Sequence, residues 1–234
     1  MASKVWSTFT AKKSNGSEVK LRIQDMPADK FEEVLIFLED YYINNNVFYK
    51  IVGFSKNPEA VKESLDIMRQ MLQGSPHSIV VCCEDKGDAV GEIVGVTVTS
   101  VITNKENLDD FLNLNFKTKE VAEIFAIYGE LLKLYDVFKG KNIDRFADDR
   151  GLAVSIDYGV EVLKELLNVR RKLCKELNTP LSVIWALSND VQRAAEAAGW
   201  ETAFEVSREE VGKKTGVKIT EEPVTYKIMI GKSL

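Results

Sequence analysis

The residues whose types and spacing best suggest a ligand-binding site are 152–164, where an apolar strand leads into a turn and a helix. The predicted strand Leu152–Ile156 ends at Asp157-Tyr158-Gly159, and a helical pattern follows directly. The first N–H groups of a helix have no partner inside the helix, and the helix dipole adds positive potential at that end. A turn of this kind favours a bound anion such as a phosphate group. The alternative is an ordinary strand-to-helix connection that binds nothing.

Other reactive side chains are few. His77 is the only histidine, so mechanisms that need two histidines are excluded. Cys82, Cys83 and Cys174 are odd in number and lie in apolar patterns. We expect buried, reduced thiols of a cytoplasmic protein rather than a disulfide or a metal site. Asp148, which precedes a second aspartate, is either half of a solvated charge pair or a carboxylate able to move a proton.

The turn belongs to a predicted β-α-β unit, because a second apolar strand, Leu181–Ala186, follows the helix. Two parallel strands need such a helical crossover. Ligands of these units bind at the carboxyl ends of the strands, beside the helix N-termini. A further helix then ends at Gly199-Trp200.

The rest of the chain supplies strands and helices around this unit. The apolar patterns predict five more strands, Glu18–Gln24, Ser78–Glu84, Val90–Ile102, Ala203–Val206 and Val224–Ile230. Helical spacing predicts helices from residue 31 to 42, from 58 to about 74, and over Thr118–Lys139. Residues 1–16 read as a polar lead-in and Gly140–Asp149 as a charged link. The order predicts one domain over residues 17–234, with a mixed α/β sheet and helices on both faces.

Composition limits the classes of function. At 234 residues with 45 % hydrophobic residues, one core can serve the chain. A net charge of −5 argues against broad nucleic-acid binding, which requires a basic face. The sequence has no apolar run of membrane-spanning length, and its first residues lack the apolar region of a secretory signal. We expect a cytoplasmic protein, most simply a monomer, without nucleic-acid or membrane partners.

Four stretches of sequence are similar to one known family. They are LAVSIDY (Leu152–Tyr158), RRKLCKELNTP (Arg170–Pro180), AAEAAGWETAFEVSREEV (Ala194–Val211) and EPVTYKIMI (Glu222–Ile230). With the order of elements over residues 18–230, they resemble the GNAT superfamily of acetyl-CoA-dependent N-acetyltransferases, and within it the insect arylalkylamine N-acetyltransferases. The resemblance implies the GNAT acyltransferase fold, with a mostly antiparallel central sheet. It also implies acetyl transfer from acetyl-CoA to the primary amine of an arylalkylamine, by direct attack in a ternary complex.

The resemblance further implies how the coenzyme is held. The strand before the turn would separate from its parallel neighbour and offer its backbone to pantetheine, and the turn would bind the pyrophosphate. The residues so implied are Leu152, Ala153, Val154, Tyr158, Gly159, Val160, Val162, Leu163, Lys164 and Ser188. In the family the turn usually reads Arg-Gly-x-Gly-x-Gly/Ala, whereas here it has one glycine. Glu161 also places a negative charge near the phosphates, a repulsion of ~1 kcal/mol in solvent.

The implied amine-binding residues are Tyr42, Asn45, Leu187 and Val191. Asn45 stands where the insect enzymes carry the glutamate proposed as general base, and an amide cannot accept a proton near neutral pH. Asp148 falls where many other GNAT enzymes place a basic carboxylate, so it is the catalytic candidate. The tyrosine that often serves as general acid maps to Ala195.

Two hypotheses follow for the function. The first is an arylalkylamine N-acetyltransferase. The second is a catalytically impaired GNAT-like protein that binds an acyl-CoA or another ligand without acetyl transfer. The missing glutamate, tyrosine and glycines favour the second hypothesis. The first stays open because a well-positioned amine that deprotonates through water can be acetylated without a protein base.

Overall fold

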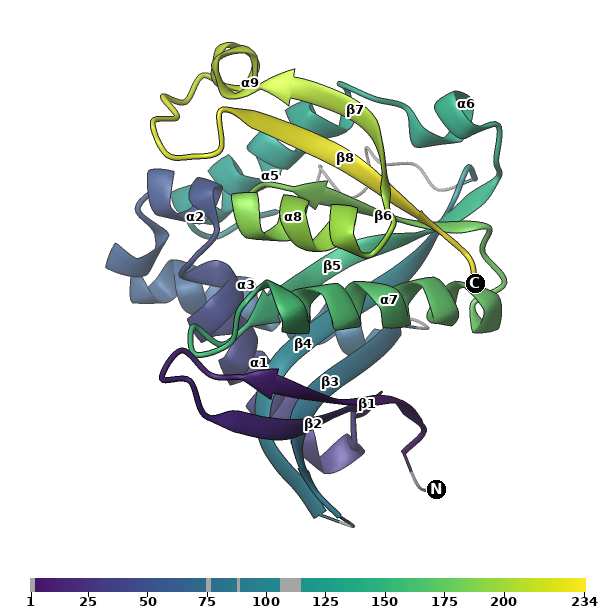
Figure 1. The fold of residues 1–234 in the computed structure, drawn as a ribbon. Helices are drawn as coiled ribbons and strands as arrows, with labels where there is room; N and C mark the ends of the chain where they lie inside the picture. The colour runs from purple at the N-terminus through teal and green to yellow at the C-terminus, as the bar shows by residue number, and fades with distance from the viewer. Residues whose placement is uncertain (1–2, 75–76, 88, 106–114) are drawn as a thin grey trace.

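The computed structural model describes residues 3–74, 77–87, 89–105 and 115–234, which form one twisted sheet with helices on both faces (Figure 1). The sheet has eight strands in the order β1-β2-β3-β4-β5-β6-β8-β7. Its strands are β1 (Val5–Lys12), β2 (Glu18–Asp25), β3 (His77–Lys86), β4 (Ala89–Thr103), β5 (Arg145–Val154), β6 (Leu181–Ala186), β7 (Glu201–Ser207) and β8 (Thr225–Lys232). All neighbouring strands are antiparallel except β5 and β6, which are parallel. The predicted mixed, mostly antiparallel α/β sheet is confirmed.

The helices form two layers, one on each face of the sheet. On one face lie α7 (Val160–Glu176) and α8 (Asn189–Ala197), and on the other lie α1 (Phe31–Leu38) and α3 (Pro58–Gly74) (Figure 1). The remaining helices are α2 (Val47–Ile51), α5 (Lys119–Leu132), α6 (Val137–Lys141) and α9 (Arg208–Thr215). Alternate residues of a strand point to opposite faces. Accordingly, Val80 and Cys82 pack beneath α7, whereas Val81 between them packs against α1 and α3.

Helix α7 is long because its apolar residues recur at helical spacing and bury one stripe of the helix against the sheet. The buried positions are Val162, Leu163, Leu166, Leu167, Val169, Arg170, Leu173 and Cys174. An arginine therefore occupies a core position within an otherwise apolar stripe. Trp200, which follows α8, packs against β8 so closely that a Cβ on Gly231 would lie 2.5 Å from the indole ring.

The first helix ends as its sequence predicts. α1 passes into a single π-helical turn, Glu39–Ile43, and the three asparagines after it do not continue the helix. Asn46 instead caps α2, because its side-chain oxygen accepts a hydrogen bond from the Phe48 backbone N–H at 2.9 Å. π-Helical turns inside helices are frequent at functional sites.

Two segments differ from the expectation. Residues 5–12, expected to lie in a polar lead-in, form β1, because Ala11 is buried and Trp6 and Phe9 lie against the core beneath α7. The second segment runs from Thr118 to Asp149, which was expected to form one helix and a charged link. It forms α5, the separate short helix α6 and the first half of β5, so Asp148 lies within a strand rather than ahead of one. β5 also ends two residues early, at Val154, and leaves Ile156 exposed.

Candidate functional site

The parallel strands β5 and β6 are paired over two positions only, Ala147 with Ser182 and Asp148 with Val183. Beyond Asp148 the two strands separate, while β4 continues to pair with β5 up to Val154. Asp149 and residues 151–154 of β5 therefore have no ladder partner on the β6 side. A strand edge inside a sheet is a row of N–H and C=O groups available to a ligand. We call this opening between β5 and β6 the strand gap.

A β-bulge lies where the strand gap begins. Thr99 of β4 faces Asp149, but Val98 faces Gly151, so Arg150 is an extra residue on β5. Gly151 has φ +157°, at the edge of the region that side chains rarely adopt. Bulges re-aim side chains and are over-represented next to active sites.

The turn after β5 leads from the strand gap into α7. Gly159 precedes the first helical residue and offers no side-chain cap, so in the described part of the chain no side chain bonds the N–H of Val160 or Glu161 in the first turn of α7. These donors and the helix dipole can receive an anion. Glu161 is exposed in this first turn.

The β1–β2 hairpin supports this turn. The Ser14 backbone N–H donates to the Asp157 carbonyl at 2.8 Å, and Lys13 forms an isolated bridge with Tyr158. The Lys13 ammonium lies 5.5 Å from the centre of the Tyr158 ring and 3.0 Å from a Glu84 carboxylate oxygen. The segment before residue 17 therefore contacts the strand–turn–helix directly.

The residues expected to hold the coenzyme surround the strand gap but differ in exposure. Ala153, Tyr158, Val162 and Leu163 are buried, whereas Gly159 and Ser188 are exposed. The remaining four, Leu152, Val154, Val160 and Lys164, are partly exposed. Ser188 caps α8 at the carboxyl end of β6, accepting a hydrogen bond from the Val191 backbone N–H at 3.3 Å. Most of these side chains are thus apolar and at least partly buried, and Gly159 and Ser188 lie exposed at the N-termini of α7 and α8.

Asp148 lies at the last paired position of β5, and 26 % of its side chain is exposed. Desolvation raises the pKa of its carboxyl, and the neighbouring Asp149 adds to the rise, against the attraction of Arg150 and Arg170. The Arg150 guanidinium lies 3.5 Å from an Asp148 oxygen. A carboxylate with a raised pKa is suited to accept a proton near neutral pH.

An aromatic cluster packs beside β5, near the point where its pairing with β6 ends. The hydroxyls of Tyr42 and Tyr128 are hydrogen-bonded to one another, and the Asn46 amide donates to Tyr128 at 3.1 Å. Burial raises the pKa of both tyrosines, and the negative charge of Asp149 raises both further. Tyr49 packs edge-to-face on Tyr42, with ring centres 6.2 Å apart. A cluster of this kind can hold an aromatic ring or a cation.

The four expected amine-binding residues are not brought together. Tyr42 and Leu187 contact one core cluster, which also contains Tyr49, whereas Val191 packs in another with Ala195. Asn45 is exposed, and its amide donates to the Asp40 and Tyr41 carbonyls of its own helix at 3.2 Å. Of the four residues, only Tyr42 and Leu187 therefore pack against the same core cluster.

Two site residues are absent from the sequence-based set. Tyr128 is one, and its position on the buried side of an amphipathic helix is typical of packing. Arg170 is the other: its charge suggests a favourable interaction with the helix C-terminus, but the residue is completely buried and pairs with Asp149 at 2.7 Å. Its spacing from Leu166 and Leu173 on α7 is the signal that predicts burial.

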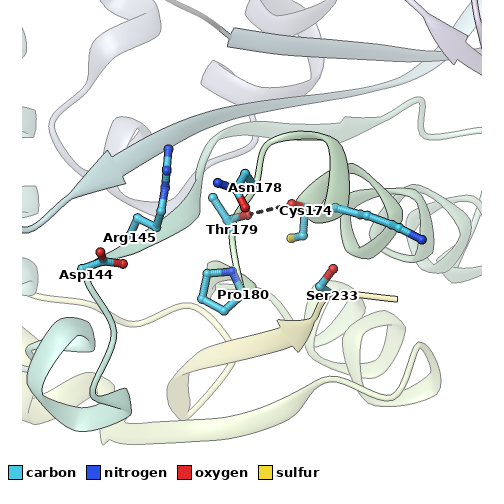
Figure 2. A pocket seen from close by; sticks show the side chains of 8 residues that line it. Asp144, Arg145, Cys174, Asn178, Thr179, Pro180 and Ser233 are labelled. Atoms are coloured by element: carbon cyan, nitrogen blue, oxygen red, sulfur yellow. Dashed lines mark hydrogen bonds between the residues drawn. The ribbon is translucent and has the colours of Figure 1, made fainter.

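A separate surface pocket of about 620 Å³ lies at the opposite ends of the same strands (Figure 2). It is lined by Asp144 and Arg145 at the start of β5, by Thr179 and Pro180 before β6, and by neighbouring residues. Figure 2 shows the Thr179 hydroxyl directed to the Cys174 carbonyl, a contact of 3.4 Å. Ligands of parallel strand pairs bind at the carboxyl ends, so this pocket is not the candidate site.

Within the part of the chain that the structure describes, no three histidine, cysteine or acidic side chains come together as metal ligands. Nor does any helix there combine the length and the apolar composition needed to cross a bilayer. The three cysteines are buried free thiols.

The chain was compared with known proteins by sequence and by structure. No protein-family model matches the sequence, and no curated protein matches it. A putative arylalkylamine N-acetyltransferase 7 from the yellow fever mosquito Aedes aegypti matches its structure with a TM-score of 0.84 at 24 % identity, over 98 % of this chain and 95 % of the other. Arylalkylamine N-acetyltransferase 2 of the same mosquito matches with a TM-score of 0.71 at 16 % identity, over 91 % and 98 %.

A bacterial protein extends this likeness. The GNAT superfamily phosphinothricin acetyltransferase from Sinorhizobium meliloti, solved in complex with AcCoA, matches with a TM-score of 0.53 at 11 % identity, over 91 % of this chain and 88 % of the other. At these identities the likeness establishes the fold. The chain therefore has the fold of the GNAT acetyltransferases, and the resemblance inferred from its sequence is confirmed at that level.

Proposed function

We propose that the protein is an acetyl-CoA-dependent N-acetyltransferase that acts on a primary amine of the arylalkylamine class. The observation that carries the proposal is the strand gap. The parallel pairing of β5 and β6 ends after two positions, β5 carries a bulge there, and the N-terminus of α7 has no side-chain cap. A continuous sheet needs none of these three features. The fold it shares with GNAT enzymes supports the same function.

The described residues fit the coenzyme in two respects. Residues 151–154, which have no ladder partner on the β6 side, offer backbone hydrogen-bonding groups to the amides of pantetheine, and Leu152 and Val154 add apolar side chains. The N–H groups of Val160 and Glu161 in the first turn of α7, which no side chain caps, would hold the pyrophosphate. When bound, acetyl-CoA supplies an acetyl thioester that an amine can attack.

The amine would bind on the other side of the strand gap, beside the aromatic cluster. Tyr42, Tyr49 and Tyr128 present ring edges and faces, and the neighbouring Asp148 and Asp149 carry negative charge. Aromatic rings and carboxylates together recognise a cation joined to an aromatic group. The support for an arylalkylamine is this combination, together with the printed names of the mosquito proteins.

Asp148 is the residue we assign as proton acceptor. It lies where the strand gap begins, its side chain is partly open to solvent, and its raised pKa favours proton transfer from an ammonium group. The positive charges of Arg150 and Arg170 limit the rise of the Asp148 pKa and so favour the ionised carboxylate. Alignment of the amine would supply much of the rate enhancement.

Three observations favour a binding protein without acetyl transfer as the second candidate. Ala195, at the position of the family's tyrosine, is completely buried and has no proton to donate. Asn45 bonds its own helix rather than a substrate. Glu161 opposes a phosphate at the helix N-terminus.

Calorimetry and a coenzyme-release assay separate the two candidates. We expect acetyl-CoA to bind with a dissociation constant in the micromolar range and a panel of dopamine, serotonin, tyramine and polyamines to reveal turnover of an aromatic amine. Asp148→Asn should then lower kcat by about 10²-fold or more without a matching loss of acetyl-CoA affinity. If acetyl-CoA gives no detectable heat, both the acetyltransferase and an acetyl-CoA-binding protein are rejected. Binding of acetyl-CoA without turnover of any amine selects the binding protein.

A further inference from the structure

Arg170 joins the two strands of the strand gap at the point where their ladder ends. Its Nη1 donates to the Asp149 carboxylate at 2.7 Å, and its Nη2 lies 3.4 Å from the Val183 carbonyl oxygen. Val183 is the last residue of β6 paired with β5, and Asp149 is the first residue of β5 beyond that pair. The Arg170 guanidinium therefore links β5 and β6 at the position where the next backbone hydrogen bonds between them would lie.

This arrangement is unfavourable as a source of stability. Arg170 is completely buried in the apolar stripe of α7, and its Nε has no hydrogen-bond partner in the described part of the chain. Burying a guanidinium costs several kcal/mol, which is offset by the Asp149 ion pair, the Val183 contact and the Trp200 ring, whose centre lies 5.9 Å from the guanidinium carbon. The unpaired Nε adds a cost of about 1–3 kcal/mol. Replacing a buried ion pair by packed apolar side chains of similar volume is often neutral or stabilising.

Guanidinium chemistry suits the task of bridging two strands. Its planar fork can reach two acceptors in fixed directions, whereas a lysine ammonium is a single point of charge. The Asp149 oxygen that accepts from Arg170 also accepts from the Gly151 backbone N–H at 3.3 Å. Arg170 is thereby connected through Asp149 to the bulge that re-aims β5.

We propose that Arg170 is a positioning residue that sets the width of the strand gap, and hence its affinity for the acyl-CoA, by bracing Asp149 of β5 to Val183 of β6. The inference rests on the proposed function in that the ligand measured is acetyl-CoA. Arg170 touches neither the amine nor the coenzyme in this proposal; it acts through the two strands.

Variants of Arg170 and of its neighbour test the proposal in the full-length chain. Arg171 is the matched control, because it follows Arg170 directly on α7 and bonds the carbonyls of Ala198 and Lys232, neither of which belongs to β5 or β6. We expect Arg170→Lys to raise the dissociation constant for acetyl-CoA about tenfold, as a displacement of the binding strand would. Arg171→Lys should stay within twofold of the parent.

A double variant separates positioning from folding. Arg170→Met combined with Asp149→Leu replaces the buried pair by apolar side chains, so the protein should melt at the parent's temperature or above. Its dissociation constant for acetyl-CoA should nevertheless rise at least tenfold. A double variant that folds and binds acetyl-CoA like the parent overturns the proposal.

Hydrogen exchange keeps this test independent of the proposed function. Amides of residues 149–154 and 184–186 should exchange several times faster in the double variant than in Arg171→Lys, whether or not acetyl-CoA is present. If the parent binds no acetyl-CoA, the proposed function fails, and exchange alone decides the role of Arg170. Unchanged exchange in those two segments rejects it.

Discussion

Three acidic side chains near the strand gap have three different surroundings. Asp148 is partly desolvated, Asp149 is tied to a buried guanidinium, and Glu161 is exposed at a helix N-terminus. The chemistry available to each depends on these surroundings rather than on residue type. Two of them can be tested by replacing a carboxylate with its amide, which keeps the shape and removes the charge.

Glu161→Gln tests the charge at the mouth of the strand gap. If the α7 N-terminus receives a phosphate, removing this repulsion should tighten acetyl-CoA binding by about fivefold, equivalent to ~1 kcal/mol. The gain should shrink as salt is added, because exposed charges are screened. Calorimetry at low and high ionic strength measures both effects. Glu209→Gln, in the first turn of α9, is the control, and an equal affinity for Glu161→Gln and parent would contradict a phosphate at α7.

Asp148→Asn should also change the pH dependence of stability. A carboxyl with a raised pKa binds its proton more tightly in the folded than in the unfolded protein, so its contribution is full below the ordinary value of 3.8 and is lost as pH rises through the folded-state pKa. An amide cannot ionise, so the variant should melt above the parent at pH 7 and level with it at the acidic end. Melting temperatures between pH 3 and 8 check this. A variant that melts below the parent at neutral pH would refute it.

Arg170 shows why the sequence led to only part of the site. Its neighbours, Arg171 and Lys172, lie toward solvent, and three consecutive basic residues at the end of a helix are typical of a charged surface. Only helical spacing distinguishes the buried one. Tyr128 is similar, because a tyrosine on a buried stripe is usually core. The turn at Gly159 was predictable, since strand, turn and helix signals are local, whereas Asp148 was expected ahead of the strand and lies within it.

At the scale of elements, α5 owes its start to a side chain from another helix. Glu63 of α3 accepts hydrogen bonds from the backbone N–H groups of Lys117 and Thr118 and from the Thr118 hydroxyl, at 2.5, 2.8 and 2.6 Å. Burial raises the pKa of Glu63, but these hydrogen bonds outweigh it and the net pKa is lowered. Since α5 carries Tyr128, this cap positions one wall of the aromatic cluster.

Glu63→Gln should destabilise the protein by about 2 kcal/mol at pH 7, the value of charge-assisted hydrogen bonds at a helix end. The stabilising effect of a lowered pKa is present above the ordinary value of 4.5 and lost as pH falls through the folded-state pKa. The difference between variant and parent should therefore close in acid. Urea unfolding at pH 7 and pH 3 measures it. Glu59→Gln, an exposed change in the first turn of α3, serves as control, and equal losses in both would exclude the cap.

Element boundaries were predictable where apolar residues are continuous. β6 occupies the range predicted from the sequence, Leu181–Ala186, because its residues are mostly apolar and a turn residue stands close to each end. The first half of β5 was not predictable. Its residues 145–150 read RFADDR, with four charged positions in six. They are held in a strand by pairing with β4 and by the arginine of α7, which are contacts between segments distant in sequence.

At the scale of the whole molecule, the N-terminal strand contributes to the site through support. β1 is an edge strand, yet it covers the layer beneath α7 and its hairpin holds the turn before that helix. Removing residues 1–12 should lower the free energy of unfolding by about 3 kcal/mol, the value for two partly buried aromatic side chains, Trp6 and Phe9. Acetyl-CoA affinity should fall with it.

Chemical denaturation and calorimetry on the truncated chain measure the two losses. The double substitution Trp6→Ala with Phe9→Ala, which keeps the backbone of β1, should reproduce most of the loss of stability while keeping the Ser14 and Lys13 contacts to the turn. Equal acetyl-CoA affinity in the truncated and parent chains would show that the hairpin does not support the turn.

The two-position contact between β5 and β6 also has a mechanical consequence. It is the only strand pairing in the described sheet that joins strands β1 to β5 with strands β6, β8 and β7. A seam with so few backbone hydrogen bonds is where the sheet should part first under a pulling force or in partial unfolding, with α7 as the strap that spans it. The opening that would admit a coenzyme thus also divides the protein into a five-strand and a three-strand unit, and a ligand bound across it would act as a clasp between the two.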